Sequence, residues 1–172
     1  MKPIRIGILS DTHLTLPSAR FQALVDACFA GTAMILHAGD LTDLRVLQAF
    51  RGKEVHAVHG NMCSQAVCSV LPKKKVVIVG GFQIGIIHSA GVSYDFEEML
   101  LNEFDGVDCI VYGHTHQPVC HRTGSVLYIN PGSFMPTGRH GGPGTYAILE
   151  VGRELRGRIH EAPAMQTKLH SL

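Results

Sequence analysis

The sequence predicts an α/β fold, and three observations lead to this prediction. Short apolar runs recur along the first part of the chain, and amphipathic segments with helical spacing separate them. The runs are rich in Ile, Leu and Val and are bounded by glycine or polar residues, as the buried strands of a parallel sheet are. Several of these runs also end at aspartate or histidine. Alternation of strand and helix is typical of α/β proteins.

The first part of the chain supplies three strands and two helices in alternation. The expected strands are residues 4–9, 34–36 and 55–58, and the expected helices are residues 18–29 and 42–50. Apolar residues recur at helical spacing from Phe21 to Cys28. Pro17 and Ser18 are suitable residues for the start of that helix.

The second part is richer in β-structure. Residues 75–79 and 82–87 flank Gly80-Gly81, which predicts a hairpin. A helix is expected at 93–104, and a buried strand at 109–112. Four short β runs follow, at 119–121, 126–129, 146–151 and 155–159. Residues 136–144 are rich in Gly, Pro, Arg and His, and are therefore expected to form a surface loop.

The whole-chain totals indicate one globular domain without a strong charge. The chain has 172 residues, of which 45% are hydrophobic, and its net charge is +1 with histidines neutral. This length suits a single domain over residues 1–172. The composition excludes a disordered chain. The near-zero charge gives no reason to expect binding to nucleic acid or to an acidic membrane surface.

Cysteine usage and the N-terminus indicate a cytoplasmic protein. The five cysteines include no CxxC pair, so a reducing compartment is expected and a disulfide framework is not. A strand begins directly after Met1-Lys2-Pro3, whereas a signal peptide needs a longer apolar region. No apolar run approaches the roughly 20 residues of a membrane-spanning helix.

Five apolar runs are followed by residues that can bind a metal ion. Ligand sites of open α/β sheets form beyond the carboxyl ends of their strands, so these side chains are expected to gather at one edge. Five such endings in one small domain are hard to explain by packing alone. The candidate metal ligands are Asp11, His13, Asp40, Asn61, His88, His114 and His116.

Each motif alone also has a plainer interpretation. Asp11 and His13 are two positions apart and point the same way in an extended segment, but Asp11 also suits a helix cap or a turn. Asp40 and Asn61 each follow a glycine, and Gly-Asp and Gly-Asn are common turn pairs. The two histidines after Gly113 can face different ions or can be solvent-facing turn residues. Carboxylate, amide and imidazole donors without thiolate favour Mn²⁺, Fe²⁺, Ni²⁺ or Zn²⁺.

The order and context of these residues resemble the calcineurin-like metallophosphoesterases. The matching series is Asp11-x-His13, Gly39-Asp40, Gly60-Asn61, His88 and Gly113-His114-x-His116. The short chain and the sequence Asn130-Pro131-Gly132-Ser133 resemble the small bacterial and archaeal phosphodiesterase branch. The resemblance extends from residue 4 to about residue 151. It implies a four-layer α-β-β-α sandwich with two packed mixed β-sheets.

The resemblance also implies how two divalent metal ions share these ligands. One ion would be held by Asp11, His13, Asp40 and His116. The second would be held by Asp40, Asn61, His88 and His114, so that Asp40 bridges the two. Mn²⁺ is the first expectation for this binuclear centre, and Ni²⁺, Fe²⁺ and Zn²⁺ are the alternatives.

The function that follows is a metal-dependent phosphodiesterase acting on a small phosphate-ester substrate. A hydroxide bridging the ions would attack phosphorus in line, and the ions would stabilise the charge of the transition state. No protein nucleophile is expected, because the chain shows no Ser-His-Asp or Cys-His arrangement. A phosphomonoesterase or nucleotidase is one alternative. Another is a protein-binding scaffold, since a subunit of the retromer coat uses the same fold for protein contacts; homo-oligomerisation stays open.

Two departures from the family pattern affect the expected chemistry. Many relatives carry His or Cys-Asp after the metal-binding asparagine, whereas this chain reads Asn61-Met62-Cys63. An acid that could protonate the leaving group is therefore missing there, and His59 is the first candidate to assist. The second departure concerns the segment that begins at the candidate ligand His88. It reads His88-Ser89-Ala90-Gly91, whereas the family pattern has His-Gly. This changes the loop beside the metals but keeps the ligand.

Four further features near the expected site have two interpretations each. His37 either orients a ligand or is a hydrogen-bonded core histidine. The segment Asn130-Pro131-Gly132-Ser133 holds a phosphate or a water beside the metal ligands through its amides and hydroxyl, or it is a rigid turn. Arg139-His140 contacts substrate or belongs to a solvated loop. Cys63 is a soft metal ligand or a free structural thiol.

Overall fold

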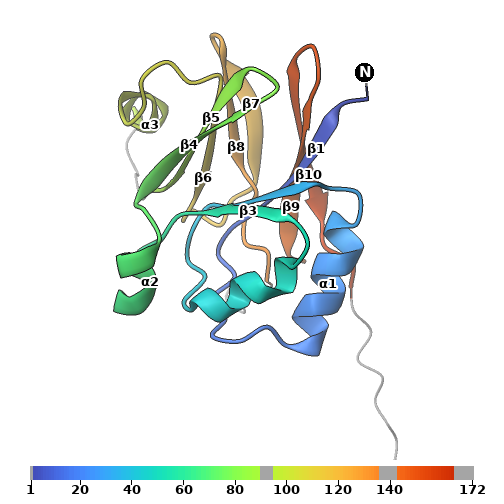
Figure 1. The fold of residues 1–172 in the computed structure, drawn as a ribbon. Helices are drawn as coiled ribbons and strands as arrows, with labels where there is room; N and C mark the ends of the chain where they lie inside the picture. Colours follow the sequence, from blue (N-terminus) through green and yellow to red (C-terminus); the bar gives the residue numbers. More distant parts are fainter. Residues whose placement is uncertain (1, 90–94, 136–142, 165–172) are drawn as a thin grey trace, which may run out of the picture.

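Two five-stranded mixed β-sheets form the body of the protein (Figure 1). The computed structural model describes residues 2–89, 95–135 and 143–164. The first sheet has the strand order β10-β9-β1-β2-β3, and the second has the order β4-β5-β6-β8-β7. In chain order the elements are β1 (Ile4–Leu9), α1 (Ala19–Phe29), β2 (Met34–His37), η1 (Leu44–Phe50), β3 (Glu54–Ala57), α2 (Gln65–Val70), β4 (Lys74–Val79), β5 (Phe82–His88), α3 (Phe96–Asn102), β6 (Cys109–Gly113), β7 (Val119–Thr123), β8 (Val126–Asn130), β9 (Thr145–Val151) and β10 (Leu155–Glu161).

Parallel pairing within each sheet places the carboxyl ends of neighbouring strands side by side. In the first sheet, β2 is the parallel neighbour of both β1 and β3. In the second sheet, β6 is the parallel neighbour of both β5 and β8. β9, β4 and β7 run antiparallel to their neighbours, which makes both sheets mixed.

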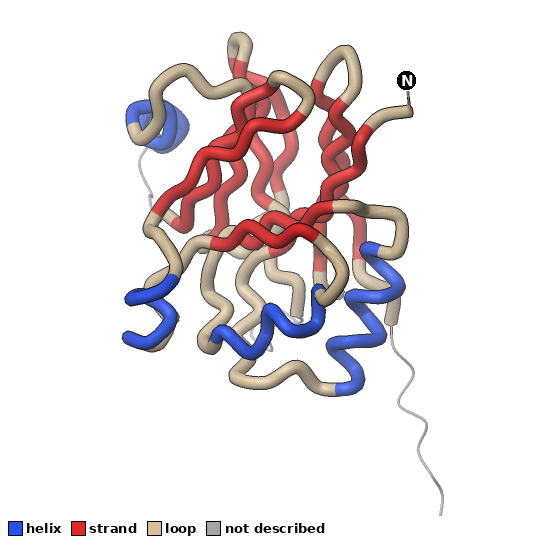
Figure 2. Tube along the Cα trace, in the orientation of Figure 1, coloured by secondary structure: helices blue, strands red, loops and turns tan. Residues whose placement is uncertain are grey.

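Three apolar clusters separate four layers of secondary structure. The central cluster lies between the two sheets and includes Ile6 of β1 and Val111 of β6. A second cluster packs Phe29 of α1 and Phe50 of η1 against the first sheet. A third packs Leu100 of α3 against the second sheet. The implied α-β-β-α order is therefore confirmed, and Figure 2 shows the helices outside the strands.

The helices begin at polar caps. Ser18 precedes α1, as expected, and its hydroxyl accepts a hydrogen bond from the Phe21 N–H. The helix expected at 42–50 is the 3₁₀ helix η1, which Asp43 caps. The short helix α2 was not expected from the sequence. It follows the Asn61 segment and begins after Ser64, whose hydroxyl caps it.

The strands agree with the expected ones to within two residues at each end. The β4–β5 hairpin turns at Gly80 and Gly81, whose φ angles of 59° and 86° suit a two-residue turn. The helix expected at 93–104 corresponds to α3, and its first two expected residues lie outside the described residues. Residues 136–142 of the expected surface loop also lie outside them. Within the described part of the chain, no helix is long and apolar enough to cross a membrane.

Candidate metal centre

The loops that follow β1 and β2 lie against each other at one edge of the first sheet. The two strands are parallel neighbours, and their hydrogen bonding continues beyond the strand ends. The Asp11 N–H donates to the Gly39 carbonyl oxygen at 3.0 Å, and the His13 N–H donates to the Asp40 carbonyl oxygen at 2.9 Å. The backbone therefore holds three candidate ligands close together.

Most of the candidate ligands have a left-handed backbone. This conformation costs a non-glycine residue on the order of 1 kcal/mol or more, so it persists only where the surroundings impose it. Such strain is typical of functional sites. Among the described residues, positive φ outside glycine occurs at Thr42 and at the candidate ligands Asp11, His13, Asp40, His114 and His116.

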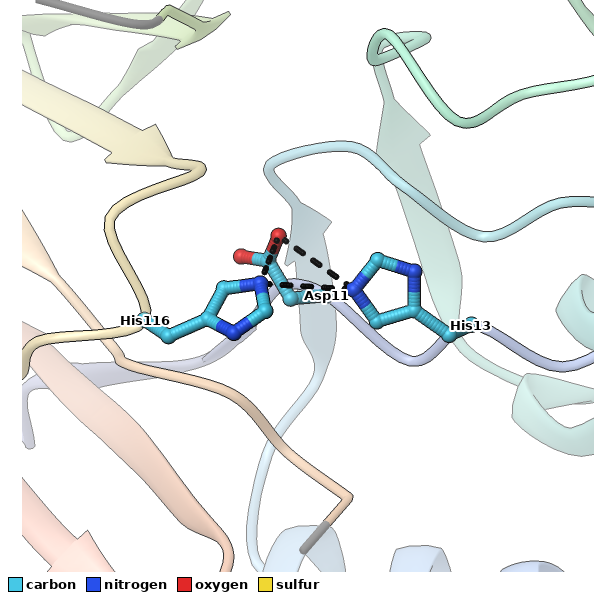
Figure 3. A group of neighbouring side chains, drawn as sticks. All are labelled: Asp11, His13 and His116. Carbon is cyan, nitrogen blue, oxygen red and sulfur yellow. Dashed lines mark hydrogen bonds and ion pairs between the residues drawn. The ribbon is translucent and has the colours of Figure 1, made fainter. Parts of the chain in front are cut away.

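The first group of ligands consists of Asp11, His13 and His116, whose side chains point toward one another (Figure 3). The His116 Nε2 atom lies 3.1 Å from Asp11 Oδ1 and 3.3 Å from His13 Nε2. The His13 Nε2 atom lies 3.8 Å from the same Asp11 oxygen. The carboxylate is fully buried, whereas both imidazoles are partly exposed. The buried carboxylate of Asp11 therefore faces two imidazoles that are partly accessible to solvent.

The second group consists of Asp40, Asn61, His88 and His114. The His88 Nε2 atom lies 3.3 Å from Asp40 Oδ2 and 3.2 Å from Asn61 Oδ1. The His114 Nδ1 atom lies 2.9 Å from the same Asn61 oxygen. Asp40, His88 and His114 each offer one ligand atom, and these atoms lie within 4.8 Å of one another. The structure therefore brings all seven candidate ligands into two adjacent groups.

His88 shows which of its ring nitrogens faces the second group. Its Nδ1 atom lies 2.7 Å from the Ala38 carbonyl oxygen, which can only accept, so Nδ1 carries a proton. Nε2 then faces Asp40 and Asn61. Burial opposes a positive charge on His88, but its hydrogen bond to Asp40 and the charges of Asp11 and Asp40 raise its pKa above the ordinary value. A cation at this position, whether a proton or a metal ion, balances the negative charge.

Backbone amides support both carboxylates. Asp40 Oδ1 accepts the Met62 N–H at 2.8 Å, and Asp11 Oδ2 accepts the His114 N–H at 3.2 Å. Burial alone would raise the pKa of Asp40. The hydrogen bond and charge of His88, together with the Met62 N–H, outweigh burial and keep this pKa below its ordinary value. Sequence reasoning missed the amide of Met62, because a residue letter carries no signal for a backbone donor.

The glycines before three of the ligands fill positions that no side chain can occupy. A Cβ atom on Gly60 would lie 2.1 Å from Asp40 Oδ1, and one on Gly113 would lie 2.0 Å from Ser10 Oγ. Gly39 is similarly enclosed, and its φ is 100°. The glycines of the sequence motifs are therefore needed because the ligands pack directly on their Cα atoms.

The donor set fits divalent metal ions. Each group offers a carboxylate and two imidazoles, and Asn61 adds an amide oxygen. These donors suit Mn²⁺, Fe²⁺, Ni²⁺ and Zn²⁺. The Nε2 atoms of His13 and His116, 3.3 Å apart, also favour a bound cation. Two facing lone pairs at this distance repel unless a proton or a metal ion lies between them. That Asp40 bridges both ions stays a prediction.

The Asn130–Ser133 turn supports the site and does not present its hydroxyl to a ligand. The Ser133 hydroxyl lies 3.0 Å from the Asp11 carbonyl oxygen and 2.7 Å from that of Met135. Its single proton is therefore used within the protein. Asn130 is buried and bonds to the neighbouring loop residues. The rigid turn is the interpretation that fits, and a phosphate-holding role for the Ser133 hydroxyl does not.

The other residues weighed from the sequence have mixed outcomes. The Cys63 sulfur accepts the Gly60 N–H at 3.2 Å, which favours a structural thiol. His59 is half-buried, and among the described residues no hydrogen bond joins its ring to either ligand group. Its assistance in catalysis stays a prediction. Arg139 and His140 lie outside the described residues.

Fold and site together define a class of protein. Two packed mixed sheets carry, at the ends of parallel strands, two groups of oxygen and nitrogen donors suited to metal ions. Residues 4–154 match the family model of the calcineurin-like phosphoesterase superfamily domain. The chain belongs to this superfamily, as the resemblance in its motifs indicated.

Individual relatives agree with this assignment. A probable metallophosphoesterase of Methanocaldococcus jannaschii is 35% identical over 137 residues, which cover 74% of this chain and 67% of the relative. A phosphodiesterase of the same organism is 29% identical over 142 residues, covering 75% of this chain and 83% of that protein. The structure of vacuolar protein sorting 29 from Cryptosporidium parvum superposes with a TM-score of 0.74 at 18% identity, covering 95% and 94% of the two chains. The last likeness is one of fold.

Proposed function

We propose that this protein is a two-metal phosphodiesterase that hydrolyses small phosphate diesters. Membership of the calcineurin-like phosphoesterase superfamily supports a phosphoesterase, and two relatives bear the names probable metallophosphoesterase and phosphodiesterase. Each ligand group would hold one ion, Asp40 would be the ligand that both ions share, and phosphate diesters would be the substrates.

The observation that carries the proposal is the coincidence of backbone strain with side-chain convergence. Five of the seven candidate ligands have positive φ. Glycine adopts a positive φ without strain, whereas this conformation is uncommon in every other residue type, even in aspartate and histidine, which adopt it more often than most. Aspartate and histidine at these positions therefore point to a requirement for their side chains. That requirement is explained by metal binding.

The chain's own residues prepare the site for a phosphate ester. Two divalent ions bound in these groups would lower the pKa of a water and neutralise the charge of the phosphate. Amides of Met62 and His114 hold the carboxylates of Asp40 and Asp11 in one orientation before any substrate arrives. Ala38 fixes the tautomer of His88 so that Nε2 faces inward. The ligands are thus positioned without reorganisation.

The test is hydrolysis by purified protein in the presence of Mn²⁺. Bis(4-nitrophenyl) phosphate serves as the diester and 4-nitrophenyl phosphate as the monoester. We expect turnover of the diester that chelator abolishes. His116→Ala should lower kcat/KM by on the order of a hundredfold or more, because even groups behind metal ligands are worth 10–100-fold. His121→Ala is the matched control, since that histidine lies in β7 and pairs with Glu97 on the surface.

A protein-binding scaffold is the alternative that the comparison with vacuolar protein sorting 29 keeps in view. A scaffold predicts no metal-dependent turnover of either ester. A phosphomonoesterase predicts a kcat/KM for the monoester above that for the diester. Either result contradicts the proposed phosphodiesterase.

A further inference from the structure

His37 contacts both the loop that carries Asp11 and His13 and the loop that carries Asp40, although it is not one of the candidate ligands. It is the last residue of β2, and its side chain is fully buried. Asp40 follows three residues later, in the loop after β2. A buried imidazole needs partners for both ring nitrogens, and these partners decide what it can do.

Both ring nitrogens of His37 have partners, and together they fix its tautomer. The Gly39 N–H donates to Nδ1 at 3.2 Å. A backbone N–H can only donate, so Nδ1 carries no proton and Nε2 carries one. Nε2 lies 3.3 Å from Thr12 Oγ1 and donates to it. The Thr12 hydroxyl proton is then available to the Asp40 carbonyl oxygen, at 3.5 Å.

This chain of hydrogen bonds crosses from one ligand loop to the other. Thr12 stands between the ligands Asp11 and His13, and Gly39 stands directly before the ligand Asp40. All three of these ligands have a strained, left-handed backbone. Strained segments keep their conformation only if the surroundings determine it more than once. The imidazole adds a buried side-chain connection to the backbone hydrogen bonds between the same loops.

We propose that His37 is a positioning residue that sets the affinity of the centre for divalent metal ions, by joining the loop of Asp11 and His13 to the loop of Asp40 through Thr12 and Gly39. The inference rests on the proposed function, because it assumes that the two ligand groups bind metal.

The charge state of His37 agrees with this role. Burial, with a contribution from the charge of His88, lowers the pKa of His37 to about 3. The ring is therefore neutral near neutral pH, and a neutral ring is the only form that can accept from Gly39 while donating to Thr12.

The test measures Mn²⁺ affinity by calorimetry on metal-free protein. His37→Phe keeps the ring volume and removes both hydrogen bonds. Thr12→Val keeps the shape of the side chain and removes the hydroxyl. We expect both to weaken Mn²⁺ binding by about 10–100-fold, the usual effect of removing a group that orients metal ligands. His56→Phe in the neighbouring strand β3 is the control, because His56 pairs with Glu54 and should leave the affinity unchanged.

The double variant separates positioning from packing. If His37 acts through Thr12, then His37→Phe/Thr12→Val should bind Mn²⁺ about as well as the weaker single variant. Fully multiplicative losses would mean that the two residues act independently, which would overturn the proposal. Mn²⁺ affinity in folded His37→Phe equal to that of the parent protein would overturn it as well.

A second readout needs no variant and decides the case if His37→Phe does not fold. Nitrogen-15 NMR of the parent protein reports which ring nitrogen of His37 carries the proton, and we expect Nε2. A proton on Nδ1 would overturn the proposal. A parent protein that binds Mn²⁺ but hydrolyses no phosphate ester would contradict the proposed function alone. A parent protein that binds no divalent ion would contradict both.

Discussion

The Nε2 atoms of His13 and His116 lie 3.3 Å apart, although 103 positions separate the two residues in the chain. His13 follows β1 of the first sheet, and His116 follows β6 of the second. The first ligand group is therefore closed only when the two sheets pack together. The geometry of this ligand group therefore depends on the packing of the central apolar cluster between the two sheets.

Replacing the ligand that both ions are proposed to share should reduce the amount of bound metal more than replacing a ligand of one ion. Asp40→Ala removes a carboxylate that, as proposed, both ions use, whereas His13→Ala removes one imidazole from one ion. We expect loss of both ions and of activity in Asp40→Ala, and partial retention of metal in His13→Ala. Metal analysis of the purified variants measures this. Two tightly bound ions in Asp40→Ala would rule out the bridge.

Adding a single methyl group at Gly60 should damage the centre. The Cβ atom would lie 2.1 Å from Asp40 Oδ1, so the carboxylate or the loop must move. Overpacking of this kind typically costs about 1–3 kcal/mol of stability, and here it should also weaken Mn²⁺ binding. Gly152→Ala is the matched control, because its Cβ would meet only Pro3, at 3.7 Å. Equal Mn²⁺ affinities in the two variants, measured by calorimetry, would contradict this prediction.

Acid should destabilise the metal-free protein through His37. Its pKa is about 3 in the folded state and near 6.5 when unfolded, so between these values the unfolded chain binds one more proton. Stability contributed by the neutral ring is thus present above about pH 6.5 and is lost as the pH falls toward 3. The slope is roughly 1.4 kcal/mol per pH unit. The raised pKa of His88 acts above this range, and the lowered pKa of Asp40 acts below about pH 4.

Urea unfolding in chelator between pH 6 and pH 4.5 measures this slope. His37→Phe should reduce it by about one proton's contribution, whereas His56→Phe should retain it. Parallel slopes for the parent protein and His37→Phe would show that His37 does not carry the acid sensitivity.

The kcat/KM for phosphodiesters should depend strongly on the pKa of the leaving group. Met62 stands where the family resemblance implies an acid-base residue, but Met62, which is 59% exposed, cannot donate a proton. The Cys63 sulfur accepts the Gly60 N–H, and its own S–H is only a weak hydrogen-bond donor. A positioned acid typically contributes 10²–10⁴-fold, so aryl phosphodiesters should react much faster than simple alkyl diesters.

A series of diesters with leaving groups of graded pKa tests this. Met62→His should reduce the dependence of kcat/KM on leaving-group pKa, and Met62→Leu should leave it unchanged. A flat dependence in the parent protein, with chemistry shown to limit the rate, would mean that another residue supplies the proton. His59 would then be examined first, by His59→Ala.

The convergence of the candidate ligands could be predicted because each of these residues follows an apolar run that predicts a buried strand. Asp11 and Asp40 follow neighbouring parallel strands of the first sheet, and His114 follows a parallel strand of the second, so each lies beyond the carboxyl end of its strand. The family resemblance added the division into two groups. The α-β-β-α layers were likewise implied by the resemblance, because local periodicity does not reveal which strands share a sheet.

Other features could not be read from the sequence because they depend on tertiary contacts. Left-handed φ at Asp11 and His116 could not be predicted, because a positive φ is uncommon even for aspartate and histidine and depends here on the packed loops. The role of Ser133 depends on the Asp11 carbonyl, which lies 122 positions away. The helix α2 is only six residues long, too short for a periodic pattern.

Anomalous diffraction from crystals grown with Mn²⁺ tests the two-metal centre most directly. We predict two anomalous peaks roughly 3.5–4 Å apart, the first beside Asp11, His13 and His116 and the second beside Asn61, His88 and His114, with Asp40 between them. A single peak, peaks elsewhere in the molecule, or two peaks that Asp40 does not join would contradict it.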